Sequence, residues 1–377
     1  MNHEPNESLL YQLALTMIPD IGAITARKLI AYVGSPEGVF SEKPSTLRSI
    51  PGIGPYLEGK IRSQNFLAEA EKELISMGKY KINHCYYQDP EYPWRLKNCE
   101  DGPLLLFYKG SPDFGRTRLL SIVGTRNAST YGREICANIV AELTAKYPDL
   151  VIVSGLAYGI DIAAHRAALD YGLDTFAVLA HGLNTIYPSS HSDAAMRIMK
   201  QGGLLSDFHS TVKPERNNFL RRNRIIAGLS EATLVIESGE KGGALITAEI
   251  ASSYNREVFA VPGRAFDTYS KGCNRLIQRN IAALIESASD IENLLNWESS
   301  KPLRDPQITI ADYLSEEEKM IIQTISKEPG IGQEILSIRC GIPIHKLLGT
   351  LLQMELKNWI SVNPGNQYRA LVRLLED

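Results

Sequence analysis

The sequence predicts an α/β protein with a central doubly wound sheet, a small helical domain before it and a second small domain after it. Three observations lead to this prediction. Short β-branched runs alternate with helical patterns over residues 119–297, which is typical of strands joined by crossover helices. A short motif is repeated within residues 1–66, and a polar, proline-bearing stretch follows residue 297.

The N-terminal domain, residues 1–66, contains two copies of one motif. Residues 18–22 read Ile-Pro-Asp-Ile-Gly, and residues 50–54 read Ile-Pro-Gly-Ile-Gly. Glycines between two helical patterns are typical of a helix-hairpin-helix, in which backbone N–H groups of the turn approach a phosphate closely. Asp20 replaces the leading glycine of the first copy, and a carboxylate there would repel DNA. The alternative is a helical bundle that uses the hairpins only as tight turns.

The central domain, residues 67–297, is expected to be an extended Rossmann-like fold with a parallel sheet. Ile135, Ile139 and Leu143 place one apolar helix face against that sheet. Ligands of such sheets bind at the carboxyl ends of the strands, so the loops after the strands are the expected site. The predicted strands are 119–123, 151–153, 175–179, 203–206, 232–236, 257–261 and 283–285.

The last part of the chain is expected to be a separate domain, residues 313–377, after a linker over residues 298–312. Ser315 and Glu318 form a capping box that starts a helix. Two short strands around the turn at 363–366 complete a pattern typical of a small winged helix. Its presumed recognition helix offers only His345, Lys346 and Lys357 as titratable contacts, so contact with protein is favoured over reading of DNA sequence.

Composition restricts the classes of function. The formal charge of −3 restricts any nucleic-acid site to a local patch. The N-terminus lacks a signal-peptide pattern and no apolar run is long enough to span a membrane, so a cytoplasmic protein without membrane association is expected. The five cysteines form no Cys-x-x-Cys pair, which argues against a zinc site and a disulfide framework. We expect neither a metal nor a cofactor.

Glycine turns follow three of the predicted strands, each at the start of a helix. Backbone N–H groups at such helix starts bind anions, and the Arg126 guanidinium would add a cation suited to phosphate oxygens. Each turn taken alone is also compatible with simple tight packing. The candidate DNA-binding residues in these turns are Gly124, Thr125 and Arg126; Ser154 and Gly155; and Lys241, Gly242, Gly243 and Thr247.

The most basic segment runs from Thr211 to Arg224. Its five cations face one acidic residue, Glu215, which gives a local charge of +4. Phe219 lies among them, and cations that follow the backbone together with a ring on which a base stacks are typical of single-strand binding. The alternative is a solvated basic loop with Phe219 in the core. The candidate residues here are Arg216, Phe219, Arg222, Asn223 and Arg224, and Arg264, Lys271, Arg275 and Arg279 would extend the track.

Taken together, these segments resemble the DNA-processing protein A (DprA/Smf) family over nearly the whole chain. The resemblance is specific because many motifs occur in the family's order. They are Tyr92-Pro93 with Pro103 and Gly110, Val123 to Arg126, Ser154 to Ala157, Gly159 to Asp161 with Ala164-His165, Tyr187-Pro188, Phe219 with Arg222 to Ile226, Gly243 to Ala248, and Val261 to Gly263.

The resemblance implies a non-enzymatic protein that binds incoming single-stranded DNA during natural transformation and loads the RecA recombinase onto it. It also implies a homodimer formed through the Rossmann-like domain. By position, Arg126, Arg216 and Phe219 match the family's phosphate-contacting and base-stacking residues, and the turns at 154–155 and 242–243 match its backbone contacts. The chain departs from the family pattern at Gly242, where a serine is usual, and at Asn280-Ile281, where Gly-Ala is usual.

An enzyme is the main alternative. Nucleotide N-glycosidases of the lysine-decarboxylase-like type also combine a Rossmann-like fold with a glycine pair, a threonine and a glutamate. Glu237, Thr247 and Glu249 around Gly242-Gly243 fit that scheme loosely, but the full Pro-Gly-Gly-x-Gly-Thr-x-x-Glu pattern is absent from the sequence.

Overall fold

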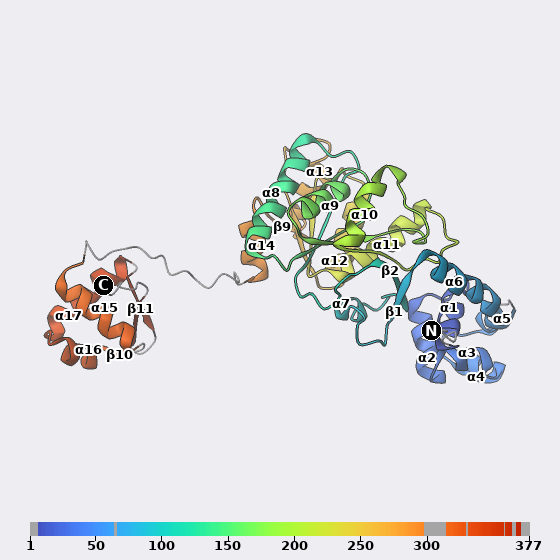
Figure 1. Cartoon of the computed structure of the whole chain (residues 1–377), viewed down its shortest axis with the longest axis horizontal. Helices are drawn as coiled ribbons and strands as arrows, with labels where there is room; N and C mark the ends of the chain where they lie inside the picture. The colour runs from blue at the N-terminus through green and yellow to red at the C-terminus, as the bar shows by residue number, and fades with distance from the viewer. Residues whose placement is uncertain are drawn as a thin grey trace. The chain divides into compact units, whose positions relative to one another are not determined.

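The computed structural model describes residues 7–63, 66–297, 314–328, 331–357, 359–363 and 367–370. The chain divides into two compact units, residues 1–298 and residues 299–377 (Figure 1). The predicted linker at 298–312 lies outside the described residues, as does most of the predicted turn at 363–366.

The first unit begins with a bundle of helices built on the repeated motif. Equivalent turns close both hairpins, because Ile21 N–H donates to Ile18 and Ile53 N–H donates to Ile50. Asp20 and Gly52 occupy equivalent positions with φ of 66° and 84°, so both copies need a left-handed residue there. The helices are α1 Glu7–Met17, α2 Ala23–Val33, α3 Pro36–Ser41, α4 Pro44–Ser49, α5 Pro55–Ser63 and α6 Phe66–Tyr80.

A sheet with the strand order β1-β2-β6-β5-β4-β3-β7-β8-β9 follows the bundle. All seven predicted strands are present, with ends shifted by at most a residue or two. The strands are β1 Asn83–Tyr86, β2 Leu105–Gly110, β3 Leu119–Gly124, β4 Val151–Ser154, β5 Asp174–Val178, β6 Gly202–Ser206, β7 Ala232–Ile236, β8 Glu257–Ala260 and β9 Ala283–Leu284.

The expectation of a purely parallel sheet is wrong at one edge. β3 to β9 pair in parallel, but β1 pairs antiparallel with β2, and β2 pairs antiparallel with β6. These two strands enter from the helical bundle without the crossover helix that a parallel pair needs, so their direction is free to reverse. The domain is therefore a mixed α/β sheet with a parallel centre.

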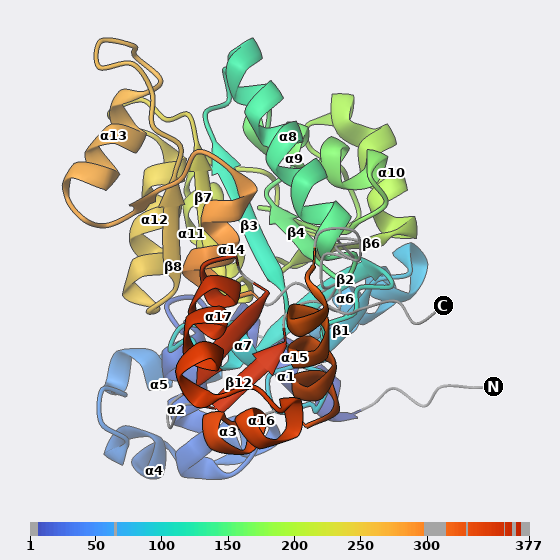
Figure 2. The same ribbon diagram turned by 90° about the vertical axis from the view of Figure 1, so that its left-hand side faces the viewer.

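Helices cover both faces of the sheet. Alternate side chains of β3 point to opposite faces: Leu120 and Ile122 pack with α8, α9 and α14, whereas Leu119 and Val123 pack with α7, α11, α12 and α13 (Figure 2). These helices are α7 Trp94–Lys97, α8 Thr130–Lys146, α9 Ile160–Asp170, α11 Arg216–Leu229, α12 Gly243–Ser253, α13 Lys271–Gln278 and α14 Ala288–Leu295; η1 Ser189–His191 and α10 Ser192–Lys200 lie between β5 and β6.

The direction of the winding changes at β3. The chain continues from β3 through β4, β5 and β6 on one side, and β7, β8 and β9 lie on the other side. The carboxyl ends of β3 and β7 therefore form a topological switch point, where ligands of doubly wound sheets bind. The loops after β3, β4, β5 and β7 converge on this edge of the sheet.

The second unit has a core of its own. Its described elements are α15 Glu316–Lys327, β10 Ile331–Gly332, α16 Gln333–Cys340, α17 Ile344–Leu356, β11 Ile360–Asn363 and β12 Gln367–Ala370, with the sheet order β10-β12-β11. The predicted capping box is present, since Glu318 N–H donates to Ser315 Oγ and Ser315 N–H donates to the Glu318 carboxylate. Among the described helices none is by itself long and apolar enough to cross a membrane, although the bent pair α16 and α17 passes that test together.

Candidate nucleic-acid interface

Arg126 and Phe219 meet above the carboxyl edge of the sheet, although they are far apart in sequence. Arg126 follows β3, and its guanidinium carbon lies 5.1 Å from the centroid of the Phe219 ring. The ring is partly exposed in the first turns of α11, beside the exposed Arg216. The Tyr187 ring, 48% exposed, has its centroid 6.1 Å from that of Phe219. An aromatic surface with cations beside it is a suitable platform for a base and its phosphate.

Arg222, which the sequence predicts as a DNA contact, faces inward. The side chain is buried and donates to the carbonyl oxygens of Gly155, at 2.8 Å, and Val178. A Cβ at position 155 would lie 2.4 Å from the guanidinium, so only glycine fits there. Burial lowers the pKa of Arg222 to about 10, opposed by the nearby Asp161 carboxylate. Arg222 therefore holds the loops after β4 and β5 together.

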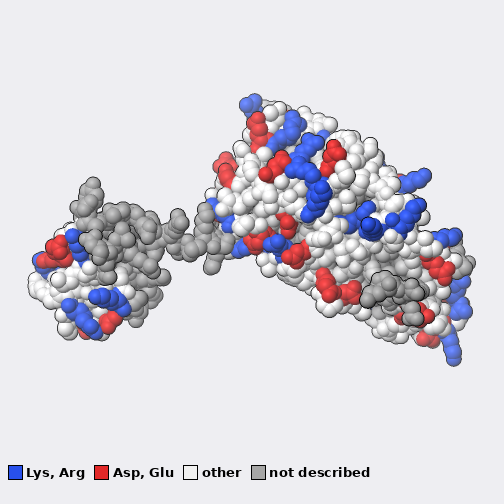
Figure 3. All heavy atoms as spheres, in the orientation of Figure 1, with Lys and Arg blue, Asp and Glu red and all other residues white. Residues whose placement is uncertain are grey.

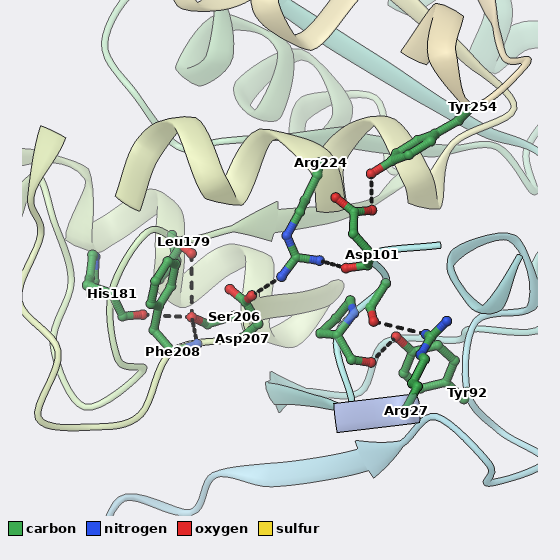
Figure 4. A network of polar contacts seen from close by, with 12 residues as sticks. Arg27, Tyr92, Asp101, Leu179, His181, Ser206, Asp207, Phe208, Arg224 and Tyr254 are labelled. Carbon is green, nitrogen blue, oxygen red and sulfur yellow. Dashed lines mark hydrogen bonds and ion pairs between the residues drawn. The ribbon is translucent and has the colours of Figure 1, made fainter. Parts of the chain in front are cut away.

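Arg224 and Asn223, which the sequence also predicts as DNA contacts, make internal contacts. Arg224 forms an ion pair with the buried Asp207 and donates to the Asp101 carbonyl, and Tyr254 donates to the Asp101 carboxylate (Figure 4). Asn223 donates to the Gly243 carbonyl at 3.2 Å. The second half of the basic segment thus anchors α11 to neighbouring elements, because those side chains point away from solvent.

In the turn after β3, a carboxylate of the protein itself accepts the hydrogen bonds. The Glu237 carboxylate accepts hydrogen bonds from the Ser129 N–H, at 2.8 Å, and from the Ser129 hydroxyl, at the start of α8. Ser129 in turn caps α8 by accepting the Gly132 N–H, and the Thr125 N–H donates to the Glu237 carbonyl. The Thr125 N–H, where the sequence predicts a phosphate contact, is therefore used inside the protein, whereas the Arg126 side chain is exposed.

A second internal carboxylate occupies the turn after β4. Asp161 is buried and accepts hydrogen bonds from the backbone N–H groups of Gly155 and Ala157. Burial raises the pKa of Asp161, and the Arg222 guanidinium opposes that rise. The Ser154 hydroxyl is also buried and donates to the Ile122 carbonyl at 2.6 Å. Ser154 and Gly155, which the sequence predicts as DNA contacts, therefore shape the loop from inside.

The turn after β7 combines a helix start that has no side-chain cap with an exposed lysine. α12 begins after Gly242 with no side-chain cap, so the first N–H groups of this helix are not capped by a side chain. Lys241 is exposed beside this helix start. The Thr247 hydroxyl is buried and donates to the Gly243 carbonyl at 3.1 Å, so it supports the turn from inside. Of the three predicted anion turns, this one keeps the features that a phosphate needs.

The second set of cations lies beyond α12. Arg264, Arg275 and Arg279 are exposed, and Lys271 pairs with Glu240 at 3.5 Å. On the face shown in Figure 3, Lys and Arg side chains form separate groups between which acidic and uncharged side chains lie. This distribution fits a local binding patch within a molecule of small net charge.

A cleft of about 1050 Å³ between the helical bundle and the loop after β6 is a poorer place for DNA. Its ionisable lining is mostly acidic and would repel phosphates. The Glu73 carboxylate accepts the N–H and the hydroxyl of Ser210 in this cleft, at 2.8 and 2.5 Å. The acidic lining residues are Asp20, Glu69, Glu73 and Asp207, and the basic ones are Lys72 and Arg221.

Two contacts of the described structure were not predicted from the sequence. Tyr187 was recognised as part of a motif, but its position beside Phe219 depends on the packing of the β5 loop against α11. The Glu73–Ser210 contact joins residues 137 positions apart. A tyrosine in the loop after a predicted parallel strand is the signal that points to Tyr187. No local pattern points to Glu73.

The sheet domain matches the model of a known protein family. A model of the family described as DNA recombination-mediator protein A matches residues 83–296. The chain belongs to this family. The motif series therefore identified it correctly. A second model, a SAM-like helix-hairpin-helix tandem, matches residues 13–64 and confirms the prediction for the N-terminal domain.

Individual members of the DprA/Smf family match over much of their length. Protein Smf of Escherichia coli is 35% identical, over 82% of this chain and 84% of the relative. The crystal structure of DNA processing protein A from Streptococcus pneumoniae has 33% identity and a TM-score of 0.65, over 77% of this chain and 98% of that one. A third match is DNA processing protein A from Helicobacter pylori, whose structure is described as showing a unique single-stranded DNA binding mode. It has 26% identity and a TM-score of 0.52, over 58% of this chain and 96% of that one.

Proposed function

We propose that this protein binds single-stranded DNA without sequence preference and passes it to the RecA recombinase in the cytoplasm during natural transformation. The contact between Arg126 and Phe219 at the switch point of the sheet carries the proposal. A cation over a partly exposed ring offers one phosphate contact and one stacking contact to the same nucleotide. Stacking needs an unpaired base, so the site favours single strands over duplex.

The proposed phosphate and base contacts are Arg126, Arg216, Phe219 and the start of α12 with Lys241, Gly242 and Gly243. The turns at 124–125 and 154–155, together with Arg222, Asn223, Arg224 and Thr247, act as supports that hold these groups in place. We also propose a homodimer through the Rossmann-like domain, and the division into domains 1–66, 67–297 and 313–377, the last a winged helix that contacts protein.

The N-glycosidase alternative has less support than DNA binding. Its general base would be a glutamate near the glycine pair, but the Glu237 carboxylate is buried and accepts hydrogen bonds at the start of α8. Glu249 lies exposed on the outer part of α12. Incubation with nucleoside monophosphates tests this alternative, and release of free base would establish it.

The main test is a binding titration with oligonucleotides of one length, single-stranded and duplex, at several salt concentrations. We expect tighter binding of the single strand, with no dependence on base sequence. Arg126→Ala and Arg216→Ala are each expected to flatten the slope of log affinity against log salt by about 0.7, because each removes one phosphate contact. Phe219→Ala should weaken binding by about 1–3 kcal/mol with little change of slope.

Arg197→Ala is the matched control for this test. Arg197 is an exposed arginine that pairs with Asp170 at 2.7 Å near the end of α10, away from the carboxyl edge of the sheet. We expect wild-type affinity and slope for this variant. Tighter binding of duplex, or wild-type slopes for both Arg126→Ala and Arg216→Ala, would move the main site away from the switch point.

A further inference from the structure

Two exposed tyrosines lie on the loops after neighbouring strands, next to the Phe219 platform. Tyr187 follows β5 and is 48% exposed, and Tyr158 follows β4 and is 49% exposed. β4 and β5 pair in parallel, so their loops emerge side by side at the carboxyl edge of the sheet. Single exposed aromatic residues are common on proteins. Here, however, one ring lies directly beside the candidate base-stacking residue.

The two loops are joined to each other by hydrogen bonds. His191 Nδ1 lies 2.9 Å from the Leu156 carbonyl oxygen, and Tyr158 Oη lies 3.1 Å from Ser190 Oγ. The Tyr158 ring packs edge-on against His191, with centroids 4.9 Å apart. Tyr187 likewise packs against both His181 and Phe219. The rings are therefore held in place before any ligand binds, which lowers the entropic cost of binding to them.

The two loop segments that carry the tyrosines have no charged side chains of their own. Residues 154–160 and 179–192 contain no Asp, Glu, Lys or Arg. These segments therefore offer a phosphate no ion pair, and the nearby Arg126 guanidinium lies over Phe219, 5.1 Å from the ring centroid. Exposed rings in an uncharged setting are suited instead to the flat faces of nucleobases. Their chemistry therefore differs from that of Arg126 and Arg216.

The distance and angle between the Phe219 and Tyr187 rings favour the binding of bases that are not stacked on one another. The Phe219 and Tyr187 centroids are 6.1 Å apart with an interplanar angle of 59°. Stacked bases in a duplex strand follow at about 3.4 Å and lie nearly parallel. Two bases that use both rings must therefore separate and tilt, which a single strand does readily and a duplex does not.

We propose that Tyr187 and Tyr158 form a second stacking site, on which nucleobases beyond the one on Phe219 bind as the strand crosses the ends of β5 and β4. This inference rests on the proposed binding of single-stranded DNA. The strand is held by its phosphates near Arg126 and Arg216 and by its bases alone over the tyrosines. Extending an oligonucleotide onto the tyrosines thus increases affinity without steepening its salt dependence.

Binding of oligothymidylates of increasing length to the full-length protein tests this inference. Tyr187→Leu and Tyr158→Leu keep an apolar side chain but remove the aromatic face, and each is expected to weaken binding of a long oligonucleotide about fivefold or more. The salt slope should not change. Tyr187→Phe and Tyr158→Phe should restore near wild-type binding. Tyr171→Leu is the matched control, because Tyr171 is 49% exposed but lies at the end of α9, at the opposite edge of the sheet.

Photochemical crosslinking gives a second measurement on the unaltered protein. A single 5-iododeoxyuridine moved along the oligonucleotide should crosslink to the peptide that holds Tyr187 at one position and to the peptide that holds Tyr158 at another. This measurement decides the matter even where a leucine variant fails to fold. Crosslinks confined to other peptides would overturn the inference.

The failure of this inference and of the proposed function are distinguishable. Wild-type affinity for Tyr187→Leu and Tyr158→Leu, with weak binding by Phe219→Leu, would remove the second stacking site and leave the proposed function intact. No binding of any single strand by the wild-type protein would remove both.

Discussion

Adjacent arginines on α11 have opposite roles because a helix turns by about 100° per residue. Arg221 is exposed, and its guanidinium carbon lies 5.3 Å from the Phe208 ring centroid. Arg222 is buried and donates to two loop carbonyls. Arginine is thus exposed at position 221 and buried as a structural residue at position 222. Charge in the sequence is therefore a poor guide to which cation meets DNA.

The different contacts of Arg222 and Arg221 predict different effects on the free energy of unfolding. Arg222→Ala leaves two buried carbonyl oxygens without a donor, at about 1–3 kcal/mol each, and leaves Asp161 without its nearby cation. We expect the free energy of unfolding to fall by at least about 2 kcal/mol. Arg221→Ala, the matched control, should change it by no more than about 0.5 kcal/mol. Chemical denaturation measures both, and equal stabilities would show that Arg222 is not a structural residue.

Buried histidines make stability depend on pH. Burial lowers the pKa of His165 to about 3, well below its ordinary value of 6.5, and also lowers the pKa values of His181 and His209. The native state therefore binds fewer protons than the unfolded chain below about pH 6.5, so these groups reduce stability as pH falls. At pH 5.5 the cost is about 1.4 kcal/mol for a group such as His165.

Denaturation at pH 7.5 and pH 5.5 tests this expectation. The wild-type free energy of unfolding should be lower at pH 5.5. His165→Asn removes one of the titrating groups, and the loss between the two pH values should shrink by about 1 kcal/mol in this variant. An unchanged difference would mean that His165 is accessible to protons in the native state.

At the scale of elements, α6 and α2 each contact a different loop of the sheet domain. α6 supplies Glu73, which accepts two hydrogen bonds from Ser210 in the loop between β6 and α11. α2 supplies Arg27, which donates to the carbonyls of Cys99 and Gly102 in the segment before β2 (Figure 4). The loop that leads into Arg216 and Phe219 is therefore held at its start by α6, a helix that contains none of the proposed DNA contacts.

Glu73→Ala should loosen this loop. We expect faster hydrogen exchange over residues 207–215 and about 2- to 10-fold weaker binding of single-stranded DNA, because binding must then order the loop. Glu69→Ala is the matched control, since Glu69 lies on the same helix and lines the same cleft. Unchanged exchange and affinity in Glu73→Ala would show that the loop keeps its position without this contact.

At the scale of the whole molecule, the proposed site lies entirely in the first unit. The three loops, α11 and the support from α6 are all contained in residues 1–298, and the second unit has a separate core. The cations of α17 near its ends are paired, Lys346 with Glu317 at 2.6 Å and Lys357 with Glu318 at 3.5 Å. They are thus less available to phosphates than Arg126 or Arg216.

A fragment of residues 1–297 should therefore fold and bind single-stranded DNA within about twofold of the full chain. The comparison uses the same oligonucleotide and salt concentration for both proteins, with thermal unfolding to show that the fragment is folded. A loss of tenfold or more in a folded fragment would assign DNA contacts to the second unit.

The sequence by itself determined the parts of this protein that depend on local pattern. The run 119–123 was recognised as a strand because four of its five residues are aliphatic or β-branched, and the repeat at 18–22 and 50–54 identified the hairpins. The ordered motifs identified the family. Arg126 and Phe219 were found because both stand out locally, one after a strand and one among cations.

Only the tertiary structure decided which of these residues face solvent and which are buried. Glu237 and Ser129 are 108 positions apart, yet their contact fills a turn that the sequence left open for a phosphate. The Asp161 carboxylate likewise accepts backbone hydrogen bonds in the turn after β4. The antiparallel edge formed by β1 and β2 likewise depends on how the helical bundle meets the sheet. Local propensity cannot contain this information, because a free N–H group and one that is paired through long-range packing have the same sequence around them.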